Sequence, residues 1–394
     1  ENDTALLRNG GSTTIAPLNN DFDPSGGILV LQSVSAPPDS GVTVTVVDHS
    51  LLQITAASTV PANLTVDYTV TNGTSSATGK VAIVPVTQSQ PQPPVVTNDT
   101  AVVRAGDVVT VPVLDNDSSP SGLNLSVDSQ VSLVGDELGT AWVSEDTLRF
   151  RAGDQPGRTS YAYTAKDDQG QTASGVLTVE VRAQDAEHNS APSPRNLEAR
   201  TLAGSATNIT VPLDGIDPDG DSVSLVGLNQ APSLGSVEVN SSWLTYKPSE
   251  GASGTDTFTY VVEDRFGAQS TGTVRVGVAQ SSPLNVAPVA TDDLVVAKPG
   301  RTVAVDVLSN DLDTDGDTLS LEGDPVSSDP SLGVSTRAGR LVLNLPDKEG
   351  NHSVAYTVSD GRGGTDTGTV TVQVSNDAPL ANPVGVDDYV TVDQ

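Results

Sequence analysis

Four aspartates in one short segment are the residues of this 394-residue chain best suited to chemistry. Asp311, Asp313, Asp315 and Asp317 recur at every second position, and Gly316 lies between the last two. Carboxylates packed this densely repel one another unless a hard cation offsets their charge, and Ca²⁺ takes about six to eight oxygen ligands. The segment therefore predicts a calcium-binding loop.

The residues after the aspartates determine which kind of calcium loop is expected. With Glu322 added, the segment satisfies the spacing of an EF-hand loop. The residues after Gly316 alternate like a strand, however, with Leu319 and Leu321 on one side. Glu322 is then expected to face solvent, and no flanking helices are expected. The alternative to a metal site is a solvated turn whose aspartates form local hydrogen bonds.

The chain repeats with a period of about 96 residues, and this period fixes which elements carry the loop. A tyrosine is followed four residues later by Asn or Asp, and then by a turn. These tyrosines are Tyr68, Tyr163, Tyr260 and Tyr356, at spacings of 95, 97 and 96 residues. A fixed period of this kind defines a tandem-repeat architecture.

Linkers divide the chain at the same period. Residues 87–93, 182–194 and 279–285 are polar, proline-containing stretches between strand-rich blocks. We expect four Ig-like repeats at residues 1–87, 94–181, 191–278 and 287–375. Residues 378–394 restart the pattern and are expected to open a fifth repeat, as in an excerpt from a longer array.

The composition predicts that each repeat is built from strands. Thr, Val and Leu are abundant, 36 Gly and 26 Pro punctuate the chain, and no segment has helical periodicity. In the fourth repeat, alternation predicts seven strands, at 294–296, 303–308, 319–321, 333–336, 341–345, 353–359 and 367–374. This pattern predicts an all-β chain of tandem seven-stranded Ig-like or cadherin-like β-sandwiches, arranged end to end.

Three runs of the fourth repeat carry a resemblance to a known family. They are APVATDD at 287–293, VLSNDLDTDGD at 307–317 and YTVSDGRGG at 356–364. They resemble the bacterial tandem Ig-like/cadherin-like repeats of large surface or adhesin-like proteins. The resemblance covers all four repeats, and it is fullest in the fourth. It implies an exported stalk of many repeats, often stiffened by calcium, and it does not imply one particular ligand.

A cadherin-like arrangement implies further ligands for the acidic loops. In the fourth repeat the loop would meet Asp360 of the tyrosine turn, together with Asp292 or Asp293 near the start of the repeat. In the third repeat Asp264 of the tyrosine turn would join the loop, whose aspartates are Asp217, Asp219 and Asp221.

The acidic loop weakens toward the N-terminus. The first repeat keeps Asp21 and Asp23, and Asn72 replaces the aspartate of its tyrosine turn. The second repeat keeps Asp117, with Ser119 and Ser121 at the next loop positions. We therefore expect calcium in the third and fourth repeats, and least of all in the second.

Charge and composition exclude several classes of function. The formal charge is −31, with 39 Asp against 11 Glu, and aspartate is favoured in turns and oxygen-ligand loops. Nucleic acid is excluded as a partner, because its phosphates would be repelled. The acidic coat of a halophilic protein is the alternative explanation of the charge. No cysteine is present, and no apolar run approaches the roughly 18 residues of a membrane span.

The sequence offers no site for catalysis. His49, His188 and His352 occupy unrelated positions of the repeat, and no nucleophile elbow, phosphate loop or His-x-x-x-His pair occurs. We therefore expect neither catalytic residues nor an organic cofactor.

The chain is accordingly expected to be a bacterial, extracellular, cell-surface stalk that extends a distal domain, with its own neighbouring repeats as partners. The alternative is an adhesive module or filament subunit that binds glycan, protein or copies of itself. Trp142 and Trp243 bear on that choice, because other repeats have polar residues at these positions. Both indoles are expected to be exposed.

Overall fold

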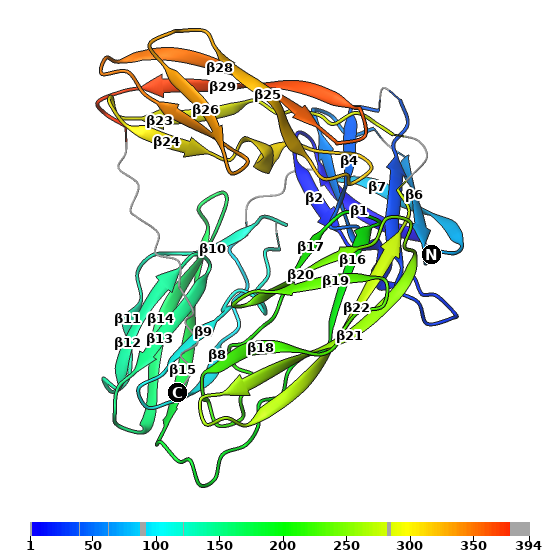
Figure 1. Ribbon diagram of the computed structural model, residues 1–394. Coiled ribbons are helices and arrows are strands. Elements are labelled where there is room, and N and C mark those ends of the chain that lie inside the picture. The colour runs from blue at the N-terminus through cyan, green and yellow to red at the C-terminus, as the bar shows by residue number, and fades with distance from the viewer. Residues whose placement is uncertain are drawn as a thin grey trace. The chain divides into compact units, whose positions relative to one another are not determined.

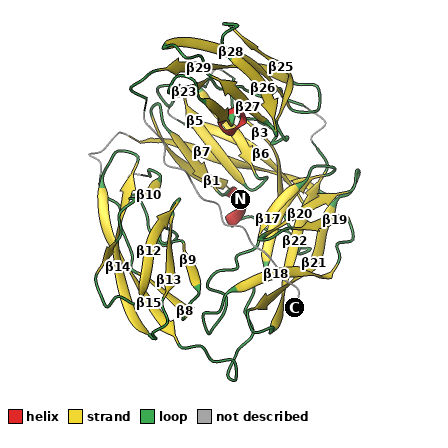
Figure 2. Ribbon diagram, turned by 60° about the vertical axis from the view of Figure 1, so that its left-hand side comes forward, coloured by secondary structure: helices red, strands yellow, loops and turns green. Residues whose placement is uncertain are grey.

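The computed structural model describes residues 2–378, apart from residues 39, 62, 87–91, 121 and 282–284. This part of the chain is β-strand and turn throughout, and its only helical elements are the short 3₁₀ turns η1 (Pro17–Asn19) and η2 (Val307–Asn310) (Figures 1 and 2). None of its helices is long and apolar enough to cross a membrane. The predicted all-β fold is confirmed. The expected fifth repeat at 378–394 lies, except for Ala378, outside the described residues.

Each of the four repeats folds around a hydrophobic core of its own. The second and third repeats together form one compact unit, and the first and fourth form another. The largest fully buried side chains include the repeat-defining tyrosines Tyr68, Tyr163 and Tyr260. The tyrosine period found in the sequence is therefore a period of core residues.

The first repeat is a sandwich of a four-stranded and a three-stranded sheet. Its strands are β1 (Asn2–Arg8), β2 (Ser12–Ile15), β3 (Val30–Ser35), β4 (Val42–Val47), β5 (Leu51–Ala56), β6 (Leu64–Thr71) and β7 (Ser76–Val86). The strand orders are β1-β7-β6-β3 and β2-β5-β4. β1 pairs with β7 in parallel, and the other pairs are antiparallel.

The third and fourth repeats have the same topology. The third contains β16 (Leu197–Leu202), β17 (Thr207–Thr210), β18 (Val223–Gln230), β19 (Gly235–Val239), β20 (Trp243–Pro248), β21 (Gly254–Asp264) and β22 (Gln269–Ala279). The fourth contains β23 (Asp293–Ala297), β24 (Thr302–Val305), β25 (Ser320–Ser327), β26 (Gly333–Arg337), β27 (Arg340–Asn344), β28 (Gly350–Ser359) and β29 (Thr365–Val374). The sheets are ordered β16-β22-β21-β18 with β17-β20-β19, and β23-β29-β28-β25 with β24-β27-β26.

The second repeat adds one short strand to this plan. It contains β8 (Asp99–Arg104), β9 (Val108–Val111), β10 (Leu125–Val127), β11 (Ser132–Leu133), β12 (Gly139–Ser144), β13 (Thr147–Ala152), β14 (Gly157–Asp167) and β15 (Thr172–Arg182). The extra strand β11 pairs with β14, beside the order β10-β14-β15-β8. The seven-stranded prediction is therefore exceeded here by a two-residue strand.

The sequence prediction was wrong at several element boundaries; the strand predicted at 319–321, for example, is the longer β25. The strand predicted at 303–308 ends at Val305, because the backbone turns into η2 at Val307. Val307 is fully buried, so the alternating apolar pattern continues after the strand has ended. The pattern alone therefore does not show that the backbone changes from a strand to a 3₁₀ turn. Two of the predicted linkers, 182–194 and 279–285, also begin one residue too early, since Arg182 and Ala279 are the last residues of β15 and β22.

A glycine faces each repeat-defining tyrosine across the neighbouring strand. Tyr356 pairs with Gly368 in the antiparallel register of β28 and β29. A Cβ atom on Gly368 would lie 2.4 Å from Cζ of that tyrosine. The pairs Tyr68–Gly79, Tyr163–Gly175 and Tyr260–Gly272 repeat this close approach. The buried ring thus lies directly over the glycine, which explains why a side chain is absent there.

Gly368→Ala is expected to lower the free energy of unfolding of the fourth repeat by about 1–3 kcal/mol, because the added methyl group displaces the buried ring. Urea denaturation of the full chain measures this loss. Thr371→Ala, at an exposed position of the same strand, is the control and should change stability by about 0.5 kcal/mol or less. Equal stability of the two variants would contradict the steric explanation.

Candidate metal centre

The acidic loop of the fourth repeat gathers three of its predicted aspartates between η2 and β25. Asp313, Asp315 and Asp317 each offer a carboxylate oxygen, and these three oxygens lie within 4.8 Å of one another. The backbone N–H groups of Asp315 and Asp317 donate to Oδ1 of Asp313, at 2.9 and 3.0 Å. Gly316 turns the chain with a φ of +77°. The loop therefore wraps around the first of the three carboxylates.

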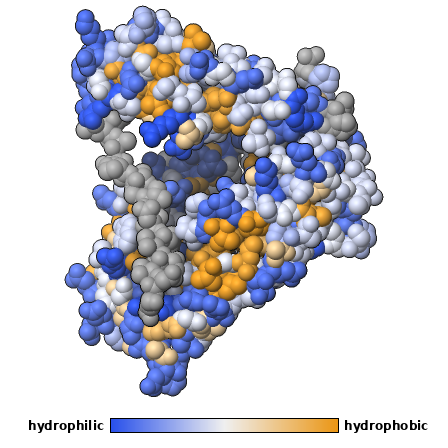
Figure 3. Space-filling model, viewed as in Figure 1, coloured by the Kyte–Doolittle hydropathy of each residue, from blue (hydrophilic) through white to orange (hydrophobic). Residues whose placement is uncertain are grey.

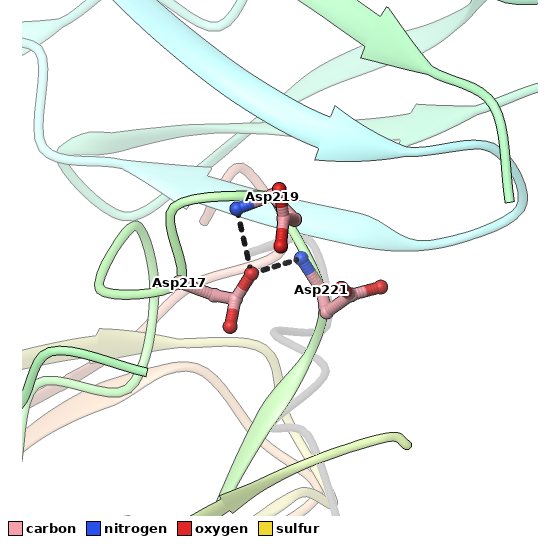
Figure 4. A group of neighbouring side chains, drawn as sticks. All are labelled: Asp217, Asp219 and Asp221. Carbon is pink, nitrogen blue, oxygen red and sulfur yellow. Dashed lines mark hydrogen bonds between the residues drawn. The ribbon is translucent and has the colours of Figure 1, made fainter. Parts of the chain in front are cut away.

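The third repeat builds the same arrangement. Asp217, Asp219 and Asp221 form a second group with carboxylate oxygens within 4.8 Å. Figure 4 shows the N–H groups of Asp219 and Asp221 donating to Oδ1 of Asp217, at 2.8 and 3.2 Å. Among the described residues, these two triads are the only groups of three or more acidic or histidine side chains so placed, so the first and second repeats contain none there.

Several carboxylate oxygens in the triads are buried without a hydrogen-bond donor. They are Oδ2 of Asp313, Oδ2 of Asp217 and Oδ1 of Asp221. These three residues are only 5–6% exposed. A buried acceptor without a donor is costly, and a buried charge more so. A hard cation with oxygen ligands would satisfy these atoms, so the residues present fit a calcium ion.

The pKa shifts show the same electrostatic cost. Burial raises the pKa of Asp313 to about 6, and the neighbouring charge of Asp317 contributes in the same direction. Burial also raises the pKa of Asp217, Asp221 and Asp315. Without a cation, both triads therefore hold carboxylates that resist ionisation.

The predicted tyrosine-turn aspartates lie near the triads, and the linkers hold them there. Asp264 and Asp360 are buried, and their charges help to raise the pKa of Asp217 and Asp315 respectively. Asn189 donates from Nδ2 to Oδ2 of Asp264 at 2.7 Å. In the fourth repeat the Nδ2 group of Asn285 donates to Oδ2 of Asp360 at 2.6 Å.

Sequence reasoning missed both asparagines, although a signal was present. Each stands two residues before an Ala-Pro pair, in Asn189-Ser-Ala-Pro and Asn285-Val-Ala-Pro. The residue after each asparagine also contacts the acidic loop. The N–H of Ser190 donates to Oδ2 of Asp219 at 2.7 Å, and that of Val286 donates to Oδ2 of Asp315 at 2.8 Å. The start of each repeat is thus tied to its acidic loop.

The remaining predicted ligands of the fourth repeat have other partners. The hydroxyl of Tyr356 lies 3.1 Å from Oδ2 of Asp293 and 3.3 Å from Oδ1 of Asp311. The carbonyl oxygens of Thr291 and Val307 also lie within 3.4 Å of it, so these four acceptors surround one donor. Asp292 accepts from the N–H of Thr369 at 2.9 Å. The structure therefore places these three aspartates at the tyrosine and the first strand, apart from the triad.

In the first repeat, which has no triad among its described residues, hydrogen bonds stabilise the carboxylate of the loop aspartate. Asp23 accepts hydrogen bonds from Ser25, Gly27 and Asn72. These bonds, led by the one from the Ser25 hydroxyl, lower the pKa of Asp23 to about 2. Its carboxylate is stabilised by neutral donors, and the loop does not need a cation.

The family of the chain is decided by four matching segments. Residues 1–84, 91–180, 189–277 and 285–373 each match the family model of the bacterial Ig domain. The chain belongs to the bacterial Ig domain family. Members of this family are typically extracellular and non-catalytic, and tandem bacterial Ig domains form structural or adhesion-type modules.

Three of the solved structures that are similar to the chain are tandem arrays of extracellular-type domains by their names. The four immunoglobulin domains 1–4 of Sidekick-1 are 15% identical over 95% of this bacterial Ig array and 97% of that chain, with a TM-score of 0.30. The N-terminal four Ig domains of Dscam1 isoform 7.44 are 12% identical over 95% and 97% of the two chains, with a TM-score of 0.31. Drosophila N-cadherin EC1-4 is 13% identical over 95% and 99%, with a TM-score of 0.23.

No curated protein matches the chain by sequence.

Proposed function

We propose that this chain is a non-catalytic stalk segment of a large bacterial surface protein, and that calcium rigidifies its third and fourth repeats. Four tandem repeats, each with its own core, support the stalk. At about 3.3 Å per residue along a strand, each repeat adds on the order of 30–40 Å to such a stalk. The repeats would thereby extend a distal functional domain from the cell surface.

The observation that carries the calcium proposal is the set of buried carboxylate oxygens without donors in the two triads. Asp313, Asp315 and Asp317 would hold the ion in the fourth repeat, and their counterparts Asp217, Asp219 and Asp221 in the third. A bound cation would neutralise their mutual repulsion. Because each loop also contacts the start of its repeat, ordering the loop would limit movement of the linker.

The alternative function, an adhesive module, rests on exposed apolar side chains. The side chain of Trp142 is 37% exposed beneath the guanidinium of Arg149, and Trp243 is 39% exposed. On the face seen in Figure 3, a broad hydrophobic region lies over the third repeat, whose exposed large apolar residues are Val226, Val239, Trp243 and Phe266. These features differ from repeat to repeat, whereas the separate cores recur in all four. The stalk is therefore the function that the structure supports best.

Thermal melting with calcium and with chelator tests the proposal. Calcium is expected to raise the melting midpoint, because a ligand that binds only the folded state adds about 2.7 kcal/mol of stability at 100 times its Kd. Magnesium is the control, since it demands a more rigid octahedral site and should stabilise less. An identical melting midpoint in calcium and in chelator would contradict calcium binding by the two triads. The acidic side chains would then serve only to keep the surface solvated.

A further inference from the structure

The acidic loop of the third repeat is contacted by two arginines of the second repeat. Arg104 ends β8, and its Nε lies 3.2 Å from Oδ2 of Asp221 while its Nη2 lies 3.7 Å from Oδ2 of Asp219. Arg182 ends β15, and its Nη1 lies 3.7 Å from Oδ1 of Asp219 and donates to the carbonyl of Pro218 at 2.7 Å. Both arginines thus bring positive charge to one triad.

Backbone contacts also hold the end of β8 against the 217–221 loop. The N–H of Arg104 donates to the carbonyl of Gly220 at 2.8 Å. Gly220 has a φ of +82°, and a Cβ atom there would lie 2.7 Å from Cα of Val103. The loop therefore rests on the end of β8 with no space for a side chain.

A second ion pair runs in the opposite direction across the same junction. Asp107, just after β8, accepts from the guanidinium of Arg265 in the tyrosine turn of the third repeat. It also accepts from the N–H of Ser222 at 3.2 Å. Each repeat thus supplies both an acid and a base to the contact.

The main pair is buried, which distinguishes it from a surface salt bridge. The side chain of Arg104 is 5% exposed, and that of Asp221 is fully buried. Exposed ion pairs contribute little to stability, whereas breaking a buried pair on one side leaves an uncompensated charge. Arg104 also donates from Nη1 to the carbonyl of Ala183 at 2.7 Å, which holds the guanidinium in place.

The third repeat cannot offer the same arginines to a following repeat. Leu202 ends β16 where Arg104 ends β8, and Ala279 ends β22 where Arg182 ends β15. Both are buried in the third repeat. The triad of the fourth repeat instead receives one arginine from its own tyrosine turn, since Nη1 of Arg362 lies 2.6 Å from Oδ2 of Asp317.

We infer that Arg104 and Arg182 form an arginine lock, in which the second repeat supplies positive charge to the 217–221 loop and holds the junction between the second and third repeats when no calcium is bound. The lock goes beyond the proposed function and does not depend on calcium. A calcium ion at the third repeat would have to compete with Arg104 for Asp221. The junction between the second and third repeats would then be held by arginines that the third repeat does not offer to a following repeat.

A two-dye distance measurement on the full chain in chelator tests the lock. The chain has no cysteine, so Ser174→Cys in β15 and Ser241→Cys before β20, both at exposed positions, give two labelling sites. The parent chain is expected to show one narrow distribution of transfer efficiency. Arg104→Gln combined with Arg182→Gln should abolish that single narrow peak, because the loop loses both of its arginines.

Two further variants control the measurement. Lys166→Gln, at an exposed position of β14 in the same repeat, removes a positive charge that does not contact the 217–221 loop and should leave the distribution narrow. Asp107→Asn breaks the reciprocal pair without touching either arginine and should broaden it, so the result does not depend on one double variant folding. A narrow peak in the double arginine variant, or a broad one in the parent, would overturn the lock. Neither result depends on calcium, whose effect the melting experiment measures separately.

Discussion

Asp313→Asn is expected to raise the free energy of unfolding of the fourth repeat at pH 7 in chelator, although it removes a residue of the candidate metal centre. The Asp313 carboxylate is buried beside Asp315 and Asp317, and its Oδ2 has no hydrogen-bond donor. An asparagine keeps an Oδ1 acceptor for the two loop N–H groups and carries no charge. The substitution therefore removes a repulsion and retains the turn.

The sign of this effect is set by the pKa of Asp313. Burial raises that pKa from 3.8 to about 6, so between these pH values the folded state binds more protons than the unfolded state. Stability contributed by this group is present below pH 3.8 and falls as the pH rises to about 6. At pH 7 the charged form then costs on the order of 3 kcal/mol, which sets the upper limit of the gain from Asp313→Asn.

The same substitution should have the opposite consequence in calcium. The centre loses one negative charge and one ligand oxygen, so the stabilisation of the fourth repeat by calcium should decrease sharply. Urea denaturation of the full chain, in chelator at pH 5 and pH 7 and in calcium at pH 7, measures all three expectations. Asp324→Asn, at an exposed position of the same repeat, is the matched control and should be neutral in each buffer. Destabilisation by Asp313→Asn in chelator at pH 7 would contradict the claim that the ionised Asp313 carboxylate destabilises the fourth repeat when no cation is bound.

The fold could be predicted from the sequence because its signals are local. A tyrosine at a fixed period and alternating apolar residues specify a strand and its buried face without knowledge of the rest of the chain. The triads were predictable for the same reason, since Asp313, Asp315 and Asp317 are close in the sequence. Asp311 has the same spacing, yet it contacts Tyr356, because the chain leaves η2 in an extended conformation before it wraps around Asp313.

The contacts that sequence reasoning missed join distant segments. Arg104 and Asp221 are separated by 117 residues, and Asn285 and Asp360 by 75. No spacing rule relates such residues, because their meeting depends on how strands pair and where loops end. In the sequence, the arginines at the ends of β8 and β15 look like ordinary solvent-exposed charges near a linker. Only the folded structure shows that the 217–221 loop contacts them.

Asp256 is a buried carboxylate that sequence reasoning missed, and its environment is the reverse of that of Asp313. It lies in β21 and is 0% exposed. The N–H groups of Ser233 and Leu234 donate to it at 2.9 and 2.8 Å, and the hydroxyl of Tyr246 donates at 2.9 Å. Burial opposes ionisation, but these hydrogen bonds outweigh it and lower the pKa of Asp256. The ionised carboxylate therefore stabilises the loop before β19 and the core tyrosine together.

Asp256→Asn is accordingly expected to destabilise the third repeat by about 3–4 kcal/mol, because the new amide turns a donor toward several donors and the charge-assisted hydrogen bonds are lost. Since the folded pKa is depressed, the contribution of this carboxylate is complete above its unfolded value of 3.8 and is lost as the pH falls through the folded value. The free energies of unfolding of the parent and of Asp256→Asn should therefore become more alike in acid. For Asp313→Asn, by contrast, the difference in the free energy of unfolding is largest near neutral pH.

Urea denaturation of the full chain at pH 7 and at pH 3 measures this second effect. Glu238→Gln, at an exposed position of β19, removes a charge from the same repeat and should be neutral. Tyr246→Phe removes one donor and leaves the others, so its loss should be smaller than that of Asp256→Asn. A neutral Asp256→Asn would show that the hydrogen bonds to Asp256 do not offset its burial. Together the two substitutions separate a carboxylate that needs an external cation from one that the fold itself satisfies.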